Sequence, residues 1–341
     1  MVPAVKAYLQ KLIHGESLSR SEAHAVFDRI MSGEVEPVQI AAVLTALAAK
    51  GESIEEIVGA AEVMRERVTR IACSADCIDT CGTGGDGIST FNVSTTAAVI
   101  AAAGGATVAK HGNKTHTRSS GSAEVLASVG VNLDADIRTV ERCLAEARIG
   151  FLFAIKLHPA MKYAGPVRTA LGVRTIFNFL GPLTNPAGAR RQVVGVPHAD
   201  LTEKLARALK ELGAERAMVV HGLDGLCDLT ITGETRISEL ADGVLSTYAV
   251  TPESVGLPRG DLSELLVDSP EASAAAVREI LSGRRSARRD HAVLNAAAAL
   301  VVAGLVDDLP SGVQRAQKAI DDGDAKRTLD LLVRLSNEPA G

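Results

Sequence analysis

A glycine-rich segment carries the residue types that could hold a phosphate group. It reads "DTCGTGGDGISTFNVST" from Asp79 to Thr95, and four glycines lie between positions 82 and 87. Glycine lets backbone N–H groups approach phosphate oxygens closely, and a helix that begins near Asn92 would add the partial positive charge of its N-terminus. The segment therefore predicts a phosphate-binding loop between a strand and a helix.

The same segment also fits the dinucleotide fingerprint G-x-G-x-x-G through Gly82, Gly84 and Gly87. A dinucleotide site requires in addition an acidic residue about 20 positions further on, which holds the ribose hydroxyls. Lys110 occupies that region instead, and no Lys-Ser/Thr pair follows the glycines at the spacing of a P-loop. The spacing argues against both a nicotinamide cofactor and a P-loop nucleotide.

A basic segment follows the glycine loop. No Asp or Glu occurs between Asp86 and Glu124, although the chain holds 41 acidic residues. The basic and imidazole side chains that gather there are Lys110, His111, Lys114, His116 and Arg118. Asp86 itself would repel a bare phosphate unless a metal ion or a ribose hydroxyl lay between them. A sugar with a metal-bridged diphosphate, such as 5-phosphoribosyl 1-diphosphate, would match both the positive side chains and the negative Asp86 carboxylate.

The elements that must position these loops follow two patterns. Residues 4–67 have helical periodicity, with a capping box at Ser19 and Glu22 and a helix that runs from Pro37 to Gly51. From about residue 76, short apolar runs alternate with helices, which predicts a mainly parallel sheet. The expected strands are "CIDTCG", "ATVAK", "IGFLFA", "RQVVGV" and "RAMVVHG".

The fold class that follows is α/β, with a small helical domain and a larger domain whose mainly parallel sheet is flanked by helices. We place the helical domain at residues 1–70 and expect a helical excursion at about 160–190 to return to it. The α/β domain then consists of residues 73–158 and 191–341. The excursion ends in "LGPLTNPAG", which we expect to be a loop because Pro and Gly terminate helices.

Bulk composition restricts the class of partner. The chain has 341 residues and a net charge of −5, so it lacks the overall basic charge that favours nucleic acid or anionic lipid. Five cysteines without disulfide spacing, and an N-terminus without a signal core, lead us to expect a cytoplasmic protein. The longest apolar stretch, residues 97–109, is too short to span a membrane.

The helical unit carries more apolar positions than one short helix pair could bury. The positions on which this rests include Ile40, Val43, Leu44 and Leu47. They favour a homodimer that forms through the helices.

Several long motifs resemble, in order and spacing, those of the anthranilate phosphoribosyltransferase family. They are "GTGGDGISTFNVST", "KHGN", "SGSAEVLASVGV", "FLFAIKLHPAM", "GVRTIFNFLGPLTNPAG" and "VHGLDGL". The similar stretches "MSGEVEPVQIAAVLTALAAKGES" and "RRDHAVLNAAAAL" extend the resemblance over nearly the whole chain. Several motifs in register are far more specific than the glycine spacing alone.

The resemblance implies a homodimer of the nucleoside phosphorylase/phosphoribosyltransferase-like fold, with an active site between its two domains. The implied reaction belongs to tryptophan biosynthesis. It transfers phosphoribose from 5-phosphoribosyl 1-diphosphate to the amine of anthranilate and releases diphosphate, with Mg²⁺ as cofactor.

The resemblance also implies site residues, by matching positions. Those for the phosphoribosyl donor are Gly82, Gly85, Asp86, Thr90, Asn92, Val93, Ser94, Thr95, Lys110, Lys114, Arg118 and Ser122. Those for anthranilate are Gly82, Asn113, His158 and Arg168, the last as partner of the carboxylate. The implied metal ligands are Ser94 and Asp228.

The chain departs from the family's motifs near the metal, donor and acceptor positions. Cys227 precedes Asp228 where the family usually carries Asp-Glu, and a thiol is a poor ligand for Mg²⁺. After "KHGN" the positive charge is kept but relocated, to Lys114 and Arg118. Ile155 and Lys156 replace the more usual Pro and Asn before "HPAM".

These departures leave several interpretations open. One is an anthranilate enzyme with a weakened metal site, and another is a related phosphoribosyltransferase or nucleoside phosphorylase with a different aromatic or heterocyclic acceptor. A non-catalytic relative that binds nucleic acid would require an extended basic surface, which the acidic composition does not favour.

Overall fold

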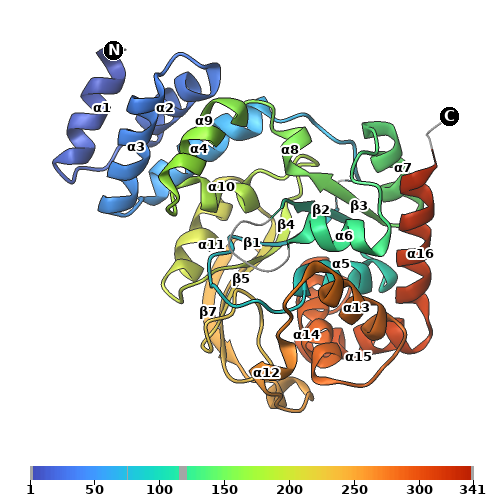
Figure 1. Ribbon diagram of the computed structural model, residues 1–341. Coiled ribbons are helices and arrows are strands. Elements are labelled where there is room, and N and C mark those ends of the chain that lie inside the picture. Colours follow the sequence, from blue (N-terminus) through green and yellow to red (C-terminus); the bar gives the residue numbers. More distant parts are fainter. Residues whose placement is uncertain (1–2, 75, 115–120, 339–341) are drawn as a thin grey trace.

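A computed structural model describes residues 3–74, 76–114 and 121–338 (Figure 1). The chain begins with a helical unit, which consists of α1 (Pro3–Ile13), α2 (Arg20–Ser32), α3 (Pro37–Lys50) and α4 (Ile54–Arg67). The predicted capping box forms at the start of α2, where Ser19 and Glu22 each accept a backbone N–H from the other. Gly51 ends α3 as predicted, with a positive φ of 84°.

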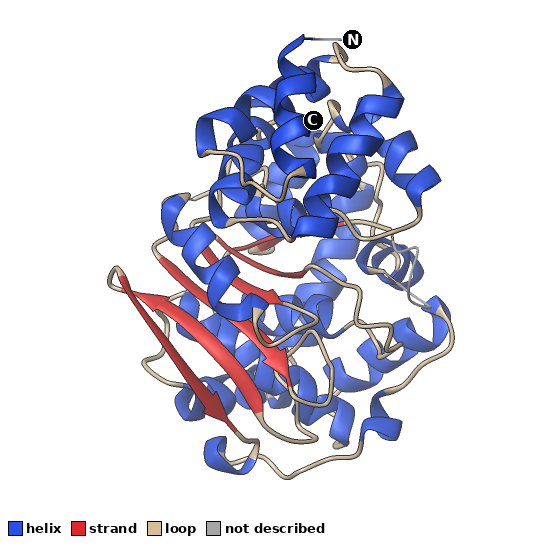
Figure 2. Cartoon of the chain, turned by 90° about the vertical axis from the view of Figure 1, so that its left-hand side faces the viewer, coloured by secondary structure: helices blue, strands red, loops and turns tan. Residues whose placement is uncertain are grey.

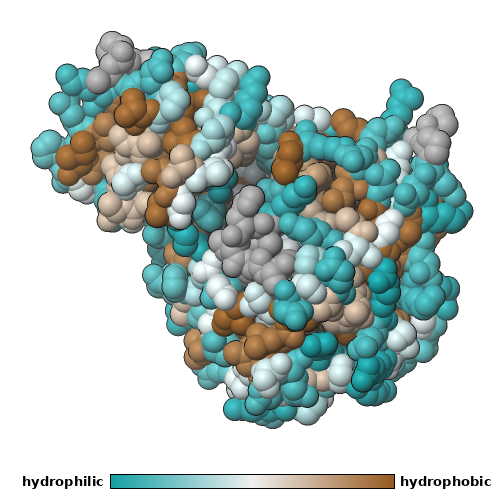
Figure 3. All heavy atoms as spheres, in the orientation of Figure 1, coloured by the Kyte–Doolittle hydropathy of each residue, from teal (hydrophilic) through white to brown (hydrophobic). Residues whose placement is uncertain are grey.

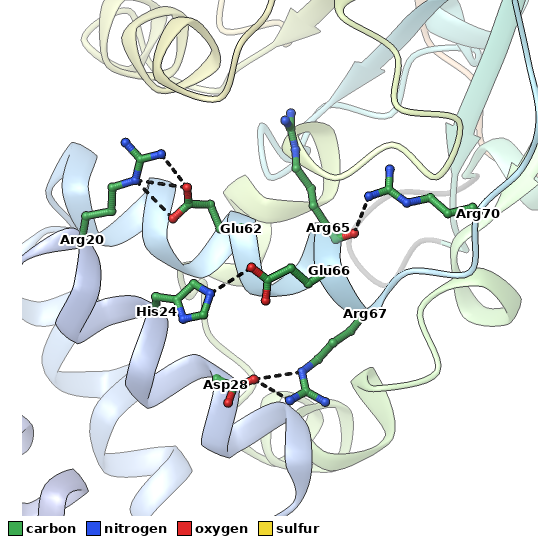
Figure 4. A network of polar contacts seen from close by, with 8 residues as sticks. All are labelled: Arg20, His24, Asp28, Glu62, Arg65, Glu66, Arg67 and Arg70. Atoms are coloured by element: carbon green, nitrogen blue, oxygen red, sulfur yellow. Dashed lines mark hydrogen bonds and ion pairs between the residues drawn. The ribbon is translucent and has the colours of Figure 1, made fainter.

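Helices α2 and α4 lie side by side and are joined by ion pairs (Figure 4). The residues on α2 are one turn apart, so they face α4 together. The pairs are Arg20 with Glu62, His24 with Glu66, and Asp28 with Arg67. Exposed pairs of this kind contribute little to stability, so the apolar contacts between the two helices hold them together.

The second unit is built on a sheet in which the described strands follow the order β3-β2-β1-β4-β5-β6-β7. The strands β1 to β5 are those predicted, and all their pairings are parallel. Strands β6 and β7 form an antiparallel hairpin that we did not predict. In chain order the strands are Ile78–Gly82, Val108–Gly112, Ile149–Phe153, Arg191–Gly195, Arg216–Gly222, Thr235–Ala241 and Val244–Val250.

Helices cover both faces of the sheet, and Figure 2 shows the strands (red) between them. Successive residues of a strand point to opposite faces, so Val193 and Val194 enter two different cores. The first core includes residues of α5 (Val93–Ala103), α6 (Ser122–Val129) and the C-terminal helices. The C-terminal helices are α13 (Pro270–Leu281), α14 (Ala287–Val302), α15 (Leu309–Asp321) and α16 (Asp324–Asn337).

The second core joins the other face of the sheet to the helical unit. It runs from the helical unit through α11 (Leu201–Glu211) to the apolar residues of β4, β5 and β6. Three further elements outside the excursion between β3 and β4 are α7 (Ile137–Glu146), η1 (Glu253–Val255) and α12 (Leu262–Leu265). None of the helices in the described ranges has the length and apolarity that crossing a bilayer requires.

The excursion between β3 and β4 forms α8 (Ala154–Leu157), α9 (Met161–Leu171) and α10 (Phe177–Leu183). Helix α9 contacts α2 and α3, and α10 contacts α4, so these helices lie beside the helical unit (Figure 1). The residue boundaries that we assigned to the two domains stay a prediction.

The prediction of a loop over "LGPL" is wrong, because α10 continues to Leu183 with Pro182 inside it. A helix leaves its last four carbonyl groups without intrahelical partners. In α10 all four receive donors from side chains. For the carbonyls from Leu180 to Leu183, the donors are Thr184 Oγ1 at 2.8 Å, His111 Nδ1 at 3.1 Å, Gln192 Nε2 at 2.7 Å and Arg65 Nε at 2.7 Å. Tertiary contacts thus stabilise a helical turn that the local sequence disfavours.

The four apolar positions that led us to expect a dimer need no second chain to bury them. Ile40, Val43, Leu44 and Leu47 are at most 1% exposed within the single chain. Helices α1 and α9 cover them, because both contact α3 and contribute apolar residues to the same core. The homodimer itself stays a prediction.

Strand β4 ends where another part of the backbone passes very close to it. The Gly195 carbonyl accepts a hydrogen bond from the Thr83 N–H at 2.9 Å. A Cβ atom on Gly195 would lie 1.7 Å from the Cys227 carbonyl oxygen and 2.6 Å from its carbon. Only glycine at this position lets the segment around Cys227 lie against the end of the strand.

Replacing Gly195 with Ala is expected to lower the free energy of unfolding by about 1–3 kcal/mol, the usual cost of overpacking. The obstructing atoms belong to the backbone, so the segment around Cys227 must shift. Gly233→Ala is the matched control, because a Cβ atom there would meet nothing within 4 Å. Urea unfolding of both variants tests this, and equal midpoints would contradict it.

Candidate active site at the switch point of the sheet

The order of the strands places the glycine loop where parallel sheets bind ligands. Strands β2 and β3 lie on one side of β1, and β4 and β5 lie on the other. In open α/β sheets ligands bind outside the carboxyl ends of the strands, where the strand order reverses. Gly82 at the end of β1 is paired with Gly195 at the end of β4, so the loop begins at this point.

The glycine loop has a backbone conformation that other residues rarely adopt. Gly84, Gly85 and Gly87 have φ values of 64°, 89° and 72°. Arg174, which precedes α10, donates from Nη1 to the Gly84 carbonyl at 2.7 Å. A Cβ atom on Gly85 would lie 1.7 Å from the same Nη1. Arg174 therefore holds one side of the loop, a role that sequence reasoning missed.

Asp86 holds the other side of the loop. Its Oδ2 accepts a hydrogen bond from the Cys227 N–H at 3.1 Å. The loop is thus joined to the segment that contains the candidate metal ligands. The predicted contact between Asp86 and the phosphoribosyl donor stays a prediction.

Helix α5 begins as predicted. Asn92 is its N-cap, and its side chain accepts the Thr95 N–H at 3.1 Å. Val93 is buried in the first turn and Ser94 is half-buried. The Oγ1 atoms of Thr90 and Thr95 are buried and have no hydrogen-bond partner among the described residues. A buried polar group without a partner costs about 1–3 kcal/mol, which a ligand with acceptor oxygens would recover.

Lys110 is buried beneath the loops, with 2% of its surface exposed. Its Nζ donates to the Thr80 carbonyl. Burial lowers the pKa of Lys110, and the nearby carboxylates of Asp79 and Asp228 oppose that shift. Lys110 therefore places a buried amino group near Asp228.

The basic loop after β2 is described only in part. Asn113 and Lys114 are exposed, and Ser122 begins α6 with its Oγ donating to the Asn113 carbonyl at 3.3 Å. The predicted donor contact Arg118 and the neighbouring His116 lie outside the described residues.

The structure brings His111 of β2 to His158, which ends α8, with 3.1 Å between their Nε2 atoms. Burial lowers the pKa of His111 to about 3 and that of His158 to about 4. Both rings are therefore neutral at pH 7. Neither ring adds positive charge to the site, because burial disfavours the protonated form.

Arg168 of α9 lies with its guanidinium 5.1 Å from the centre of the Phe177 ring. Burial lowers its pKa. It forms no ion pair with a carboxylate in the part of the chain that the structure describes. A guanidinium that stacks on an aromatic face keeps its N–H edge available for a planar carboxylate.

The candidate metal ligands offer a small set of donors. Cys227 and Asp228 are buried, and no group of three or more His, Cys, Asp or Glu residues within the described ranges could hold a metal ion. Asp224 accepts hydrogen bonds from Thr230 and Thr232 through Oδ2. Mg²⁺ commonly uses one or two carboxylates with water and substrate phosphates. The oxygen donors of Asp228 and Ser94 fit an ion held jointly with a diphosphate.

The models of two protein families match the chain. The description "Glycosyl transferase family, a/b domain" matches residues 74–326. The description "Glycosyl transferase family, helical bundle domain" matches residues 6–68. The helical unit and the sheet thus correspond to two known parts of one family of transferases.

Proteins named anthranilate phosphoribosyltransferase match the chain over nearly its full length. One from Anaeromyxobacter dehalogenans is 53% identical over 97% of this chain and 98% of the relative. One from Rhodospirillum rubrum is 49% identical over 98% of this chain and 97% of the relative. Such matches favour the anthranilate enzyme among the interpretations that the sequence left open.

Solved structures of the same name share the fold. The enzyme from Thermus thermophilus is 41% identical, has a TM-score of 0.91, and is matched over 97% of this chain and 99% of its own. The enzyme from Saccharomyces cerevisiae in complex with PRPP and Mg is 26% identical, with a TM-score of 0.90 and 98% of each chain covered. The chain therefore belongs to the anthranilate phosphoribosyltransferase family.

Proposed function

We propose that this chain transfers phosphoribose from 5-phosphoribosyl 1-diphosphate to the amine of anthranilate, in tryptophan biosynthesis. The observation that carries the proposal is the glycine loop at the switch point of the sheet. Its glycines adopt left-handed conformations, and the buried hydroxyls of Thr90 and Thr95 have no partner among the described residues. Such a loop offers backbone N–H groups and hydroxyls to a diphosphate.

The donor site extends from this loop to the ends of two neighbouring elements. Lys110 supplies a buried amino group, and Ser122 lies at the first turn of α6. The residues that we assign to the phosphoribosyl donor are Gly82, Gly85, Asp86, Thr90, Asn92, Val93, Ser94, Thr95, Lys110, Lys114, Arg118 and Ser122. The complex of the yeast relative with PRPP and Mg supports a donor of this class.

The acceptor site involves the excursion helices. Arg168 pairs with the carboxylate of anthranilate, because its side chain is half-buried, stacked on Phe177 and has no carboxylate partner among the described residues. Gly82, Asn113 and His158 complete the assignment. A second yeast structure, 25% identical to this chain, is in complex with 4-fluoroanthranilate, which supports an aromatic acceptor.

The mechanism follows from where charge develops. The bond from ribose C1 to the diphosphate oxygen breaks and its electron pair leaves with the diphosphate, while the amine nitrogen forms the new bond to C1 and then loses a proton. An aromatic amine is neutral at pH 7, so no strong base is needed before attack. The loop N–H groups, the N-terminus of α5 and Lys110 stabilise the negative charge on the leaving group.

The chain's own residues also fix the geometry of the reaction. Arg174 and Asp86 hold the loop in one conformation before substrate arrives, so its N–H groups need no rearrangement. We propose that Ser94 and Asp228 hold Mg²⁺ jointly with the diphosphate. The ion supplies further stabilisation of negative charge on the phosphate oxygens when it is bound.

The proposed reaction predicts equal loss of anthranilate and release of diphosphate when the chain is incubated with both substrates and Mg²⁺. Arg168→Lys is expected to raise the KM for anthranilate roughly 10- to 100-fold, because a charged hydrogen-bond pair is worth about 1.5–3 kcal/mol. The KM for the donor should stay within about twofold of the original, since Arg168 is assigned to the acceptor alone.

The control for this variant is Arg259→Lys, because Arg259 is exposed and paired with Glu253. It is expected to leave both KM values unchanged. Diphosphate release with other aromatic acceptors but never with anthranilate would contradict the proposed acceptor. An unchanged KM in Arg168→Lys would remove Arg168 from the site.

Cys227→Asp is expected to lower the Mg²⁺ concentration that gives half-maximal activity, roughly tenfold, because it adds a hard oxygen ligand beside Asp228. Cys227→Ser is the matched control, since it has a similar size and adds no negative charge. Activity measured over a series of Mg²⁺ concentrations tests this. An identical requirement in all three proteins would show that position 227 takes no part in metal binding.

We also propose that the chain forms a homodimer through the helical unit and resides in the cytoplasm. Figure 3 shows apolar side chains (brown) on the surface of the helical unit. Ile13 and Val38 are 67% and 75% exposed there, whereas Leu12 and Ile40 of the same helices are buried. The five cysteines are all free thiols, which agrees with a reducing compartment.

Sedimentation equilibrium is expected to give a mass near twice 35.4 kDa. Val38→Glu should reduce it to that of one chain, because a charge buried in an apolar interface without a partner is costly. Val244→Glu is the matched control, since Val244 is 66% exposed and belongs to β7 rather than to the helical unit. A single-chain mass for the unmodified protein would contradict the proposed dimer.

A further inference from the structure

The contact between His111 and His158 has a third member. The Nδ1 atom of His111 lies 3.1 Å from the Gly181 carbonyl oxygen, and its Nε2 atom lies 3.1 Å from Nε2 of His158. The two rings are 5.0 Å apart between their centres. The carbonyl belongs to the last turn of α10, where it carries partial negative charge and also accepts the backbone N–H of the C-cap residue Thr184 at 3.3 Å.

The chemistry of these three groups decides where each proton lies. A carbonyl oxygen can only accept, so Nδ1 of His111 must carry the hydrogen that it donates to Gly181. In a neutral imidazole the other nitrogen then holds a lone pair, so Nε2 of His111 is an acceptor. The hydrogen between the two rings must therefore belong to Nε2 of His158, and Nδ1 of His158 is left with a lone pair.

The surroundings keep both rings in the neutral form on which this assignment depends. His111 and His158 are 6% exposed each, and burial lowers the pKa of both rings far below 7. Protonation of His111 would add a hydrogen at Nε2, so that two hydrogens would face each other across the 3.1 Å contact with His158. No hydrogen-bond partner for Nδ1 of His158 occurs among the described residues.

We propose that His111 is a positioning residue that fixes the tautomer of His158, so that Nδ1 of His158 accepts a hydrogen bond from the amine of the aromatic substrate. This rests on the proposed function, which places His158 at the acceptor site. The amine of anthranilate carries the hydrogens that such a lone pair requires. An analogue of anthranilate whose ortho substituent has no hydrogen to donate would face the same lone pair on Nδ1 of His158. It would form no hydrogen bond there.

This arrangement orients the amine without removing its proton. The amine must keep its own lone pair for attack on ribose C1, and a hydrogen bond from its N–H to His158 leaves that lone pair free. A His158 ring in the opposite tautomer would instead donate to the amine and occupy the lone pair. The tautomer thus decides whether the bound amine can react.

Nitrogen-15 spectra of the ring nitrogens test the assignment directly in the unmodified protein, with His111 and His158 identified by the signals that each single variant removes. The expected pattern is a protonated Nε2 and an unprotonated Nδ1 for His158, and the reverse for His111. A protonated Nδ1 on His158 would overturn the proposal. This measurement needs no turnover of anthranilate. A negative result would therefore overturn the tautomer assignment without bearing on the proposed reaction.

Variants separate positioning from simple packing. His111→Asn keeps an amide near the place of Nδ1, within reach of Gly181, but removes the acceptor at Nε2. His158 is then expected to show a mixture of tautomers, and the KM for anthranilate should rise roughly tenfold with the KM for the donor unchanged. A single His158 tautomer identical to that of the unmodified protein would overturn the role of His111.

A matched pair at His158 tests the accepting atom. An Asn side chain places its amide near the position of Nδ1, whereas a Gln side chain reaches the position of Nε2. His158→Gln is therefore expected to raise the KM for anthranilate roughly tenfold more than His158→Asn. Equal values, or a larger effect of Asn, would contradict an acceptor at Nδ1.

Discussion

The glycine loop can serve a diphosphate only while its backbone keeps its left-handed shape, and the rest of the site depends on this constraint. Arg174 fixes one side through the Gly84 carbonyl, and Asp86 fixes the other through the Cys227 N–H. The close approach of Cys227 to the end of β4 requires glycine at position 195. Three segments that are distant in the sequence therefore hold one loop whose N–H groups are aligned before substrate binds.

The last turn of α10 connects this loop to the side of the site that we propose for the acceptor. Its carbonyls receive donors from α4, β2 and β4, so the turn joins the helical unit to the sheet. Arg174, which holds the loop, lies just before this helix, and Gly181, which orients His111, lies within it. The same short element thus fixes the conformation of the phosphate loop and the protonation pattern of the histidine pair.

The sequence predicted the elements whose signals are local, and it missed those that tertiary contacts decide. The capping box at Ser19 and the start of α5 at Asn92 were predicted because each depends on neighbouring residues. The β6–β7 hairpin was missed although its turn, Asp242-Gly243, has the composition and positive φ values of a tight hairpin. Arg174, Gly195 and the neutral state of His111 arise from long-range approach and burial, which no local pattern encodes.

The central claim is that this preformed loop binds a magnesium-bound sugar diphosphate rather than a dinucleotide. Calorimetric titration of the unmodified protein with 5-phosphoribosyl 1-diphosphate, at millimolar Mg²⁺ and again without the ion, tests it most directly. The account predicts saturable heat that weakens when Mg²⁺ is removed, and no heat from a nicotinamide dinucleotide. Heat from the dinucleotide, with none from the sugar diphosphate, would contradict it.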